Sequence, residues 1–307
     1  MKIFKIMLPV IAFLAVGTAW ANDDETNNID DENRNYYDAC VNNNKASACR
    51  ELAYLLGRGG EANAPKVVTY IEKACNLNDA ESCGDLGFLY MTGNIVKQDY
   101  KKANTYNEKA CNMNYGLGCH NLGVLYSEGQ GVKQDYKKAS TYYEKACNLN
   151  DGYGCNNLGN LYKNGRGVKQ DYPKANTYYE KACNLNIGRG CFGLGLFYDK
   201  KKQDYSKAKS YYEKACNLDE GAGCLNLGFL YENGLGLRQN TSIAVSYYEK
   251  GCNLKDDIAC NNLGLAYYHG TGVRQNRTTA KEYYGKSCDL GNQKGCDAYR
   301  TLNEQGY

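Results

Sequence analysis

The chain has 307 residues, with 16 cysteines, 30 tyrosines, only 3 prolines and a formal net charge of +3 at pH 7. Sixteen is an even number and far above ordinary usage, so the compartment of the protein decides what the cysteines do. The small net charge excludes a strong overall field that would attract nucleic acid or an anionic membrane. We therefore expect no nucleic-acid partner.

The N-terminus has the pattern of a secretory signal peptide, residues 1–21. Lys2 and Lys5 precede an apolar run, Ile6–Val16, and Ala19–Ala21 is a cleavage site of small residues. The apolar run is too short to span a bilayer comfortably, and no later segment is apolar enough to do so. The sequence thus predicts a secreted or periplasmic protein without a membrane span.

Beyond a polar, acidic leader (residues 22–33), the cysteines recur with a fixed period. The first cysteine of each unit recurs in steps of 36 residues, with a single step of 33, and a second one always follows eight positions later. The pairs are Cys75 and Cys83, Cys111 and Cys119, Cys147 and Cys155, Cys183 and Cys191, Cys216 and Cys224, Cys252 and Cys260, and Cys288 and Cys296. A period of this length predicts a solenoid of identical supersecondary units, a single domain over residues 34–307.

The first half of each unit predicts a helix that follows the second cysteine, as in "CNNLGNLYKNG". Leu158, Leu161 and Tyr162 recur there at helical spacing and form an apolar stripe. Gly159, which has an equivalent in almost every unit, weakens the helix, so its expected purpose is close approach of a second helix. Gly165 stands where a helix-ending glycine belongs.

The second half predicts another helix, as in "DYPKANTYYEKACNL". Asp171 is a good N-cap residue, and the equivalent positions hold Asp99, Asp135, Asp204, Asn240 and Asn276. Each unit then has a tyrosine pair, of which we expect one ring in the core and the other at the rim. At the ends, "NYYDAC" up to Cys40 predicts an N-terminal cap and "GCDAYRTLNEQ" a closing helix. The fold class is therefore all-α, with about seven helix pairs and terminal caps.

Three roles compete for the cysteines. Zinc needs four clustered ligands, yet the two histidines, His120 and His269, lie in different units. A redox centre favours C-x-x-C spacing, which the offset of eight does not match. Structural disulfides remain, and we expect neither a metal nor a cofactor.

Two pairing schemes are possible for these disulfides. One joins the two cysteines at offset eight, and the other would bridge the two helices of one unit, for example Cys155 with Cys183. We prefer the first scheme because it uses every cysteine, including Cys40 with Cys49.

The repeated words "LG-x-LY", "G-x-GV", "DY-x-KA" and "YYEKAC" resemble the Sel-one-like repeat, a relative of the tetratricopeptide repeat. With the cysteine pairs and the signal pattern, the chain is similar to the Helicobacter cysteine-rich protein family over essentially all of residues 40–307. This resemblance implies a right-handed α/α superhelix with a disulfide inside each junction, and a host-facing role outside the cytoplasm. It also implies either an interaction scaffold or penicillin binding with weak β-lactamase activity.

The resemblance further implies that the first helices line a concave groove. Counted from the second cysteine, positions +2 and +5 share the face away from the leucine stripe. The candidate ligand-binding residues on this face are Asn121, Asn157, Asn226 and Asn262 at +2, and Phe88, Asn160 and Phe229 at +5. The asparagines could clamp the amides of a peptide or muropeptide; alternatively, they are merely solvated or bond the neighbouring helix.

Catalytic machinery is hard to find in the sequence. The single S-x-x-K, Ser206–Lys209, lacks the companion motifs of serine β-lactamases, so an ordinary surface position is expected for it. We therefore expect an exported, monomeric scaffold that binds a peptide, protein or muropeptide. The alternative is a weak β-lactamase, with β-lactams as ligands.

Overall fold

The computed structural model describes residues 31–58 and 63–307, and in this part of the chain every regular element is a helix. The predicted signal peptide and leader lie outside the described residues, except for residues 31–33. The helices are α1 (Asp31–Val41), α2 (Ala46–Gly57), α3 (Ala64–Asn76), α4 (Ala80–Thr92), α5 (Tyr100–Asn112), α6 (Gly116–Glu128), α7 (Tyr136–Asn148), α8 (Gly152–Asn164), α9 (Tyr172–Asn184), α10 (Gly188–Phe197), η2 (Tyr198–Lys202), α11 (Tyr205–Asn217), α12 (Gly221–Asn233), α13 (Thr241–Asn253), α14 (Asp257–His269), α15 (Arg277–Asp289) and α16 (Gln293–Glu304).

These helices confirm the predicted repeat architecture. From α2 to α15 they form seven pairs, with α1 before the first pair and α16 after the last. The start of the chain differs slightly from expectation, because α1 begins at Asp31 and takes in the last three residues of the predicted leader.

The predicted N-caps are confirmed at all six positions. Asp99 and Asp135 each accept hydrogen bonds from two backbone amides of the following turn, at 3.0 Å. The four others each accept one. In the 33-residue unit the shortened connection is the π-helix η2, which follows α10 directly and is capped at its C-terminal end by Gln203 with a positive φ of 51°. Three loop residues are thus absent from this unit while the N-cap at Asp204 is kept.

In the five helix pairs from α6–α7 to α14–α15, the core is a tyrosine ring packed on a helical glycine. A Cβ atom at Gly159 would stand 2.8 Å from the Tyr179 ring, and the same contact recurs at Gly264 and Tyr284. Tyr179 is 4% exposed and Tyr284 3%, whereas the tyrosine that precedes each of them is half-buried. Both predictions are confirmed: the glycines permit close helix approach, and one tyrosine of each pair is core.

The half-buried tyrosines form a second recurring contact. Each stacks on the tyrosine at the end of the first helix, as Tyr142 does on Tyr126 with ring centroids 5.5 Å apart. In two pairs of the N-terminal half, a lysine ammonium lies 5.0 Å from the centroid of the first-helix ring, Lys102 over Tyr90 and Lys138 over Tyr126.

The disulfides have the first of the two pairings. Their Cα atoms are 4.5–4.7 Å apart, and each bond joins the last turn of one helix to the first turn of the next. Cys147 and Cys155 are also disulfide-bonded, so none of the 16 cysteines is free. The described bonds are Cys40–Cys49, Cys75–Cys83, Cys111–Cys119, Cys183–Cys191, Cys216–Cys224, Cys252–Cys260 and Cys288–Cys296.

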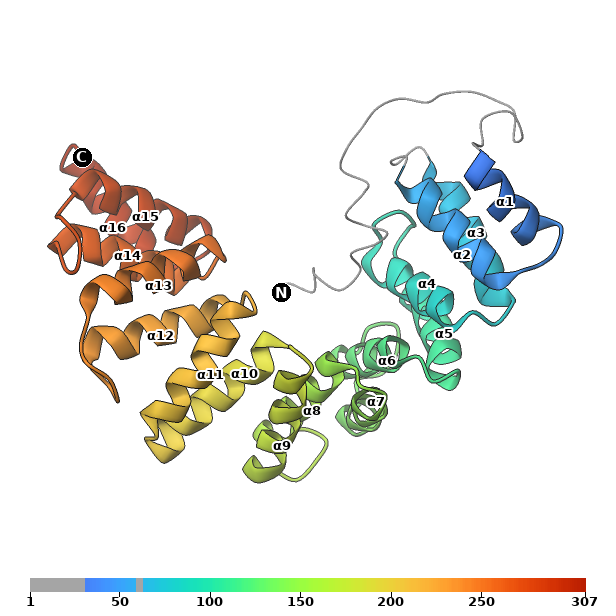
Figure 1. Ribbon diagram of the computed structural model, residues 1–307, viewed down its shortest axis with the longest axis horizontal. Helices are drawn as coiled ribbons and strands as arrows, with labels where there is room; N and C mark the ends of the chain where they lie inside the picture. Colours follow the sequence, from blue (N-terminus) through green and yellow to red (C-terminus); the bar gives the residue numbers. More distant parts are fainter. Residues whose placement is uncertain (1–30, 59–62) are drawn as a thin grey trace. The chain divides into compact units, whose positions relative to one another are not determined.

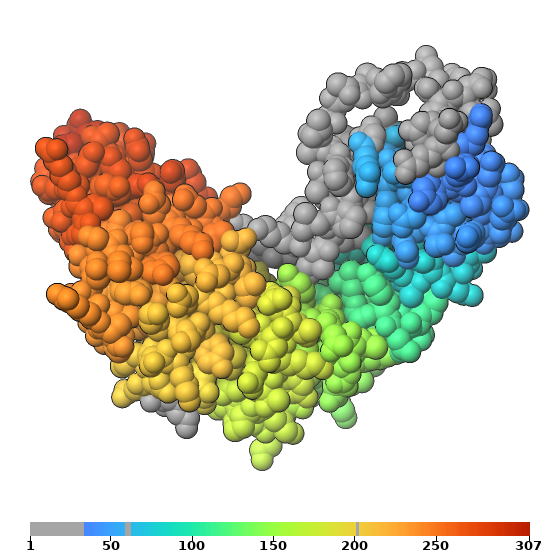
Figure 2. All heavy atoms as spheres, viewed as in Figure 1, coloured from blue at the N-terminus to red at the C-terminus, as the bar shows by residue number. Residues whose placement is uncertain are grey.

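The chain divides into two compact units. The N-terminal unit comprises the residues up to Gly154 together with 165–169, and the C-terminal unit comprises 155–164 and 170–307. Within each, consecutive helices lie side by side (Figure 1). The first helices of successive repeats are also in contact, α4 with α6 and α12 with α14. Side chains fill the space between neighbouring helices (Figure 2).

Candidate functional site

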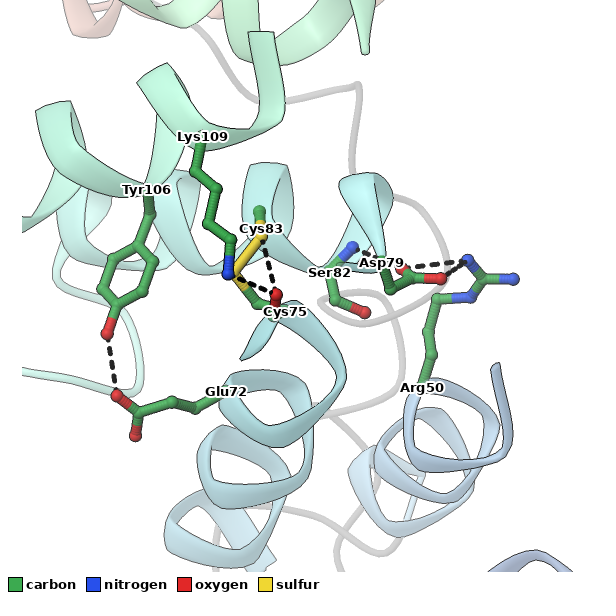
Figure 3. Close-up of a disulfide and its surroundings, with 8 residues drawn as sticks. All are labelled: Arg50, Glu72, Cys75, Asp79, Ser82, Cys83, Tyr106 and Lys109. Atoms are coloured by element: carbon green, nitrogen blue, oxygen red, sulfur yellow. Dashed lines mark hydrogen bonds and ion pairs between the residues drawn. A yellow bond between two sulfur atoms is a disulfide. The ribbon is translucent and has the colours of Figure 1, made fainter. Parts of the chain in front are cut away.

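The joints between repeats are built from structural contacts, as the turn between α3 and α4 illustrates (Figure 3). Beside the Cys75–Cys83 bond, the Lys109 ammonium of α5 donates to the Cys75 carbonyl at 2.7 Å. The Tyr106 hydroxyl, also on α5, donates to Glu72 of α3 at 2.7 Å. These contacts tie α3, α4 and α5 together at one joint and are structural. The candidate binding surface is instead the first-helix face, the side of the first helices that carries the predicted asparagines and phenylalanines.

In the N-terminal unit this face is closed at two predicted positions. Phe88 is 7% exposed and Asn121 only 2%. The prediction that these two residues face a ligand is therefore corrected.

The cause of the burial of Asn121 is a substitution in the neighbouring second helix. Asn107 stands in α5 where other units have the core tyrosine, and its carboxamide carbon would lie 2.5 Å from a Cβ at Gly87. The Asn121 amide donates to Asn107 Oδ1 at 3.1 Å. A buried carboxamide needs such a partner, so Asn121 turns into the helix interface.

In the C-terminal unit, two of the predicted asparagines bond core tyrosines. Asn160 Oδ1 accepts from the Tyr179 hydroxyl at 2.7 Å. Asn262 hydrogen-bonds Tyr248, whose hydroxyl donates to Glu232 at 2.6 Å. These contacts match the alternative in which the asparagines bond the neighbouring helix. Asn157 is half-buried and accepts a long contact of 3.4 Å from Asn156.

Two consecutive first helices of this unit present an open face. On α12, Phe229 is 41% exposed, and Asn226 beside it donates one amide hydrogen to the Ala222 carbonyl at 2.8 Å. On α14, Leu265 takes the same repeat position, also 41% exposed, and Ile258 in the same helical row is 48% exposed. We call Asn226, Phe229, Ile258, Asn262 and Leu265 the α12–α14 face.

The S-x-x-K motif lies on α11 in the expected surface position. Ser206 is exposed in the first turn of the helix. Lys209 forms an ion pair with Glu213, one turn further, at 3.3 Å. The lysine is therefore engaged along its own helix.

A charged cluster between α2 and α4 was not predicted from the sequence. The Tyr54 hydroxyl donates to Asp85 at 2.7 Å, and Arg50 pairs with Asp79 at 2.8 Å and with Glu81 at 2.9 Å. Burial, opposed by the bond from Tyr54, raises the pKa of Asp85 to about 7. The available signal was an aspartate in a column that otherwise favours asparagine.

A family model describes the same periodicity. The Sel1 repeat model matches seven consecutive segments, residues 46–79, 80–115, 116–151, 152–187, 188–220, 221–256 and 257–292. The chain belongs to the Sel1 repeat family. Each matched segment contains one first helix and the second helix that follows it.

Solved structures similar to this Sel1 repeat protein include a protective antigen of uropathogenic Escherichia coli with an SLR fold, at 26% identity and a TM-score of 0.73. The alignment covers 90% of this chain and 60% of that one, so the chain spans less than two thirds of that protein. A Sel1 repeat protein from Oxalobacter formigenes is 22% identical with a TM-score of 0.70, covering 79% of this chain and 96% of that one. Cysteine-rich protein B of Helicobacter pylori is 41% identical over 42% of this chain and 96% of its own, with a TM-score of 0.36. No curated protein matches the sequence.

The disulfides also indicate the kind of compartment in which the protein resides. Structural disulfides persist in oxidising compartments, so these bonds indicate a non-reducing, extracytoplasmic environment. In residues 31–58 and 63–307, no helix is long and apolar enough to cross a membrane.

Proposed function

We propose that this Sel1 repeat protein is an exported scaffold that binds an extended peptide, or the peptide stem of a muropeptide, on the α12–α14 face. The observation that carries the proposal is the recurrence of one pattern on two helices in contact. Phe229 and Leu265 hold the same repeat position, are equally exposed and each follow an asparagine by three residues.

The pattern suits an extended chain for geometric reasons. Packed helices lie about 8–10 Å apart, and three residues of extended backbone span roughly 10 Å. Every third ligand residue would therefore meet an equivalent pair of side chains. The apolar member would cover a ligand side chain, and the carboxamide oxygen of Asn226 would accept from a ligand backbone amide.

The test is a binding titration with defined probes: a disaccharide-tetrapeptide muropeptide, and peptides selected from a random library on the wild-type protein. A Phe229→Ala, Leu265→Ala variant should weaken binding by about tenfold or more, because apolar anchors dominate interface energies. The matched control is Ile243→Ala, which removes a side chain of similar exposure (37%) from second helix α13. Equal loss in both variants, or no loss in the first, contradicts the proposal.

The weak β-lactamase that the resemblance implies is the alternative. Turnover of a chromogenic cephalosporin that falls in the Phe229→Ala, Leu265→Ala variant would favour hydrolysis over the scaffold role. Unchanged, background-level turnover in both proteins would favour the scaffold.

A further inference from the structure

The loops within the helix pairs gather basic side chains at one edge of the N-terminal unit. A first helix runs to this edge and its partner returns from it, so each connecting loop and each N-terminus of a second helix lies there. All eight of these basic side chains are exposed. We call this set the loop edge: Lys97, Lys101, Lys102, Lys133, Lys137, Lys138, Arg166 and Lys169.

Carboxylates do little to neutralise the loop edge. Asp99 and Asp135 are used as N-caps, each bonded to two backbone amides at 3.0 Å. Asp171, which follows Lys169, is used in the same way as the N-cap of α9 and accepts from the Lys174 amide at 2.9 Å. Glu128, the last residue of α6, is the other acidic residue next to these loops. Among the described residues, none of the eight basic side chains has an ion pair with a carboxylate. The N-termini of α5 and α7, which are the positive ends of the helix dipoles, lie at the same edge.

The C-terminal unit differs at the equivalent edge. Its Lys200 pairs with Asp199 at 3.3 Å, and its Lys207 pairs with Asp204 at 3.7 Å. Arg238 and Arg274, which hold the repeat position of Lys97 and Lys133, are exposed there without a carboxylate partner among the described residues. The unpaired basic side chains are thus denser in the N-terminal unit, where no loop-edge lysine has an ion pair with a described carboxylate.

The low net charge of the chain does not cancel this row. The acidic turn residues Asp79, Glu81 and Asp151 lie at the opposite ends of the helices. A helix of 13 residues is about 20 Å long, and charges are screened beyond about 8 Å at physiological ionic strength. A partner at the loop edge would therefore experience the lysines and hardly the distant carboxylates.

Tyrosines accompany the lysines along this edge. Tyr100 and Tyr136, the first residues of α5 and α7, are half-buried. The guanidinium of Arg166 lies 5.7 Å from the centroid of the Tyr136 ring. Tyrosine has an apolar ring and a polar tip, which suits the boundary between lipid and water, and lysine ammonium groups attract anionic headgroups.

We propose that the loop edge of the N-terminal unit docks the protein on a phosphate-bearing anionic lipid surface. The loop edge belongs to the N-terminal unit and the α12–α14 face to the C-terminal unit. The two proposals therefore rest on different residues and can fail independently.

The experiment measures binding of the exported protein to vesicles of phosphatidylglycerol with phosphatidylcholine, and of phosphatidylcholine alone. We expect binding to the anionic vesicles only, weakening as salt is added. A Lys133→Gln, Lys137→Gln variant should lose about 30-fold in partition coefficient, since each lysine near an anionic surface contributes about 1 kcal/mol and tenfold corresponds to about 1.4 kcal/mol.

The matched control is Arg238→Gln, Lys294→Gln, which removes the same charge from exposed positions of the C-terminal unit. It should retain nearly all binding, and circular dichroism should show that both variants are folded. Equal loss in the two variants, no binding by the wild type, or tighter binding to soluble polyphosphate than to vesicles would each overturn the proposal.

Discussion

Two alanine substitutions in the last helix pair should change stability in opposite directions. Gly264 on α14 lies against the Tyr284 ring, and an added Cβ would be 2.7 Å from two ring carbons. Gly285 on α15 has only the Tyr299 ring near it, at 3.3 Å. Tyr284 is 3% exposed, so its ring cannot easily shift to make room for a methyl group. Tyr299 is 39% exposed, so its ring can shift towards solvent.

The magnitudes follow from two competing effects. Alanine in place of a helical glycine stabilises by about 1 kcal/mol, and forcing a methyl group into a packed core costs about 1–3 kcal/mol. At Gly285 only the first effect acts, so Gly285→Ala should raise the free energy of unfolding by about 1 kcal/mol. At Gly264 the steric cost exceeds the gain, so Gly264→Ala should lower it by up to about 2 kcal/mol.

Urea denaturation followed by circular dichroism measures both changes in the same background. A Gly264→Ala protein as stable as Gly285→Ala would refute the argument that the core glycines exist for close packing of the tyrosine rings. A stabilised Gly264→Ala together with a destabilised Gly285→Ala would refute it equally.

Two further predictions concern the N-terminal unit and the disulfides. Because the pKa of Asp85 is raised above its unfolded value of 3.8 to about 7, the folded state binds the proton more tightly, and stability should increase as the pH falls through 7 towards 4, by at most about 1.4 kcal/mol per pH unit. Asp85→Asn should flatten this dependence in urea titrations at pH 8 and pH 5; an unchanged slope would show that Asp85 is not its source. Replacing Cys216 and Cys224 by alanine opens a loop with a sequence separation of 8 and should destabilise by roughly 2–3 kcal/mol; a thermal melt unchanged from that of the wild type would contradict this.

Much of the fold could be predicted because its determinants are local and repeated. The caps at Asp99 and Asp171 depend on one side chain and the next turn, and the core role of Tyr179 follows from its fixed distance to Gly159 in sequence. Such features recur in nearly every unit, so each repeat provides the same evidence again.

Burial on the first-helix face could not be predicted in the same way. Phe88 and Phe229 hold the same repeat position, yet one is 7% and the other 41% exposed. Sequence position determines which way a helical side chain points, whereas its accessibility depends on partners from other helices. The single replacement of tyrosine by Asn107 redirected Asn121 inward, and that contact lies 14 residues away along the chain.

The placement of the disulfides has a consequence for proteolysis. Each described bond straddles a boundary between segments, as Cys111–Cys119 does between 80–115 and 116–151. A cut in the enclosed turn would therefore leave both sides covalently joined. The vulnerable connections are the loops inside each repeat, so the fragments released by a protease would each consist of the second helix of one repeat and the first helix of the next.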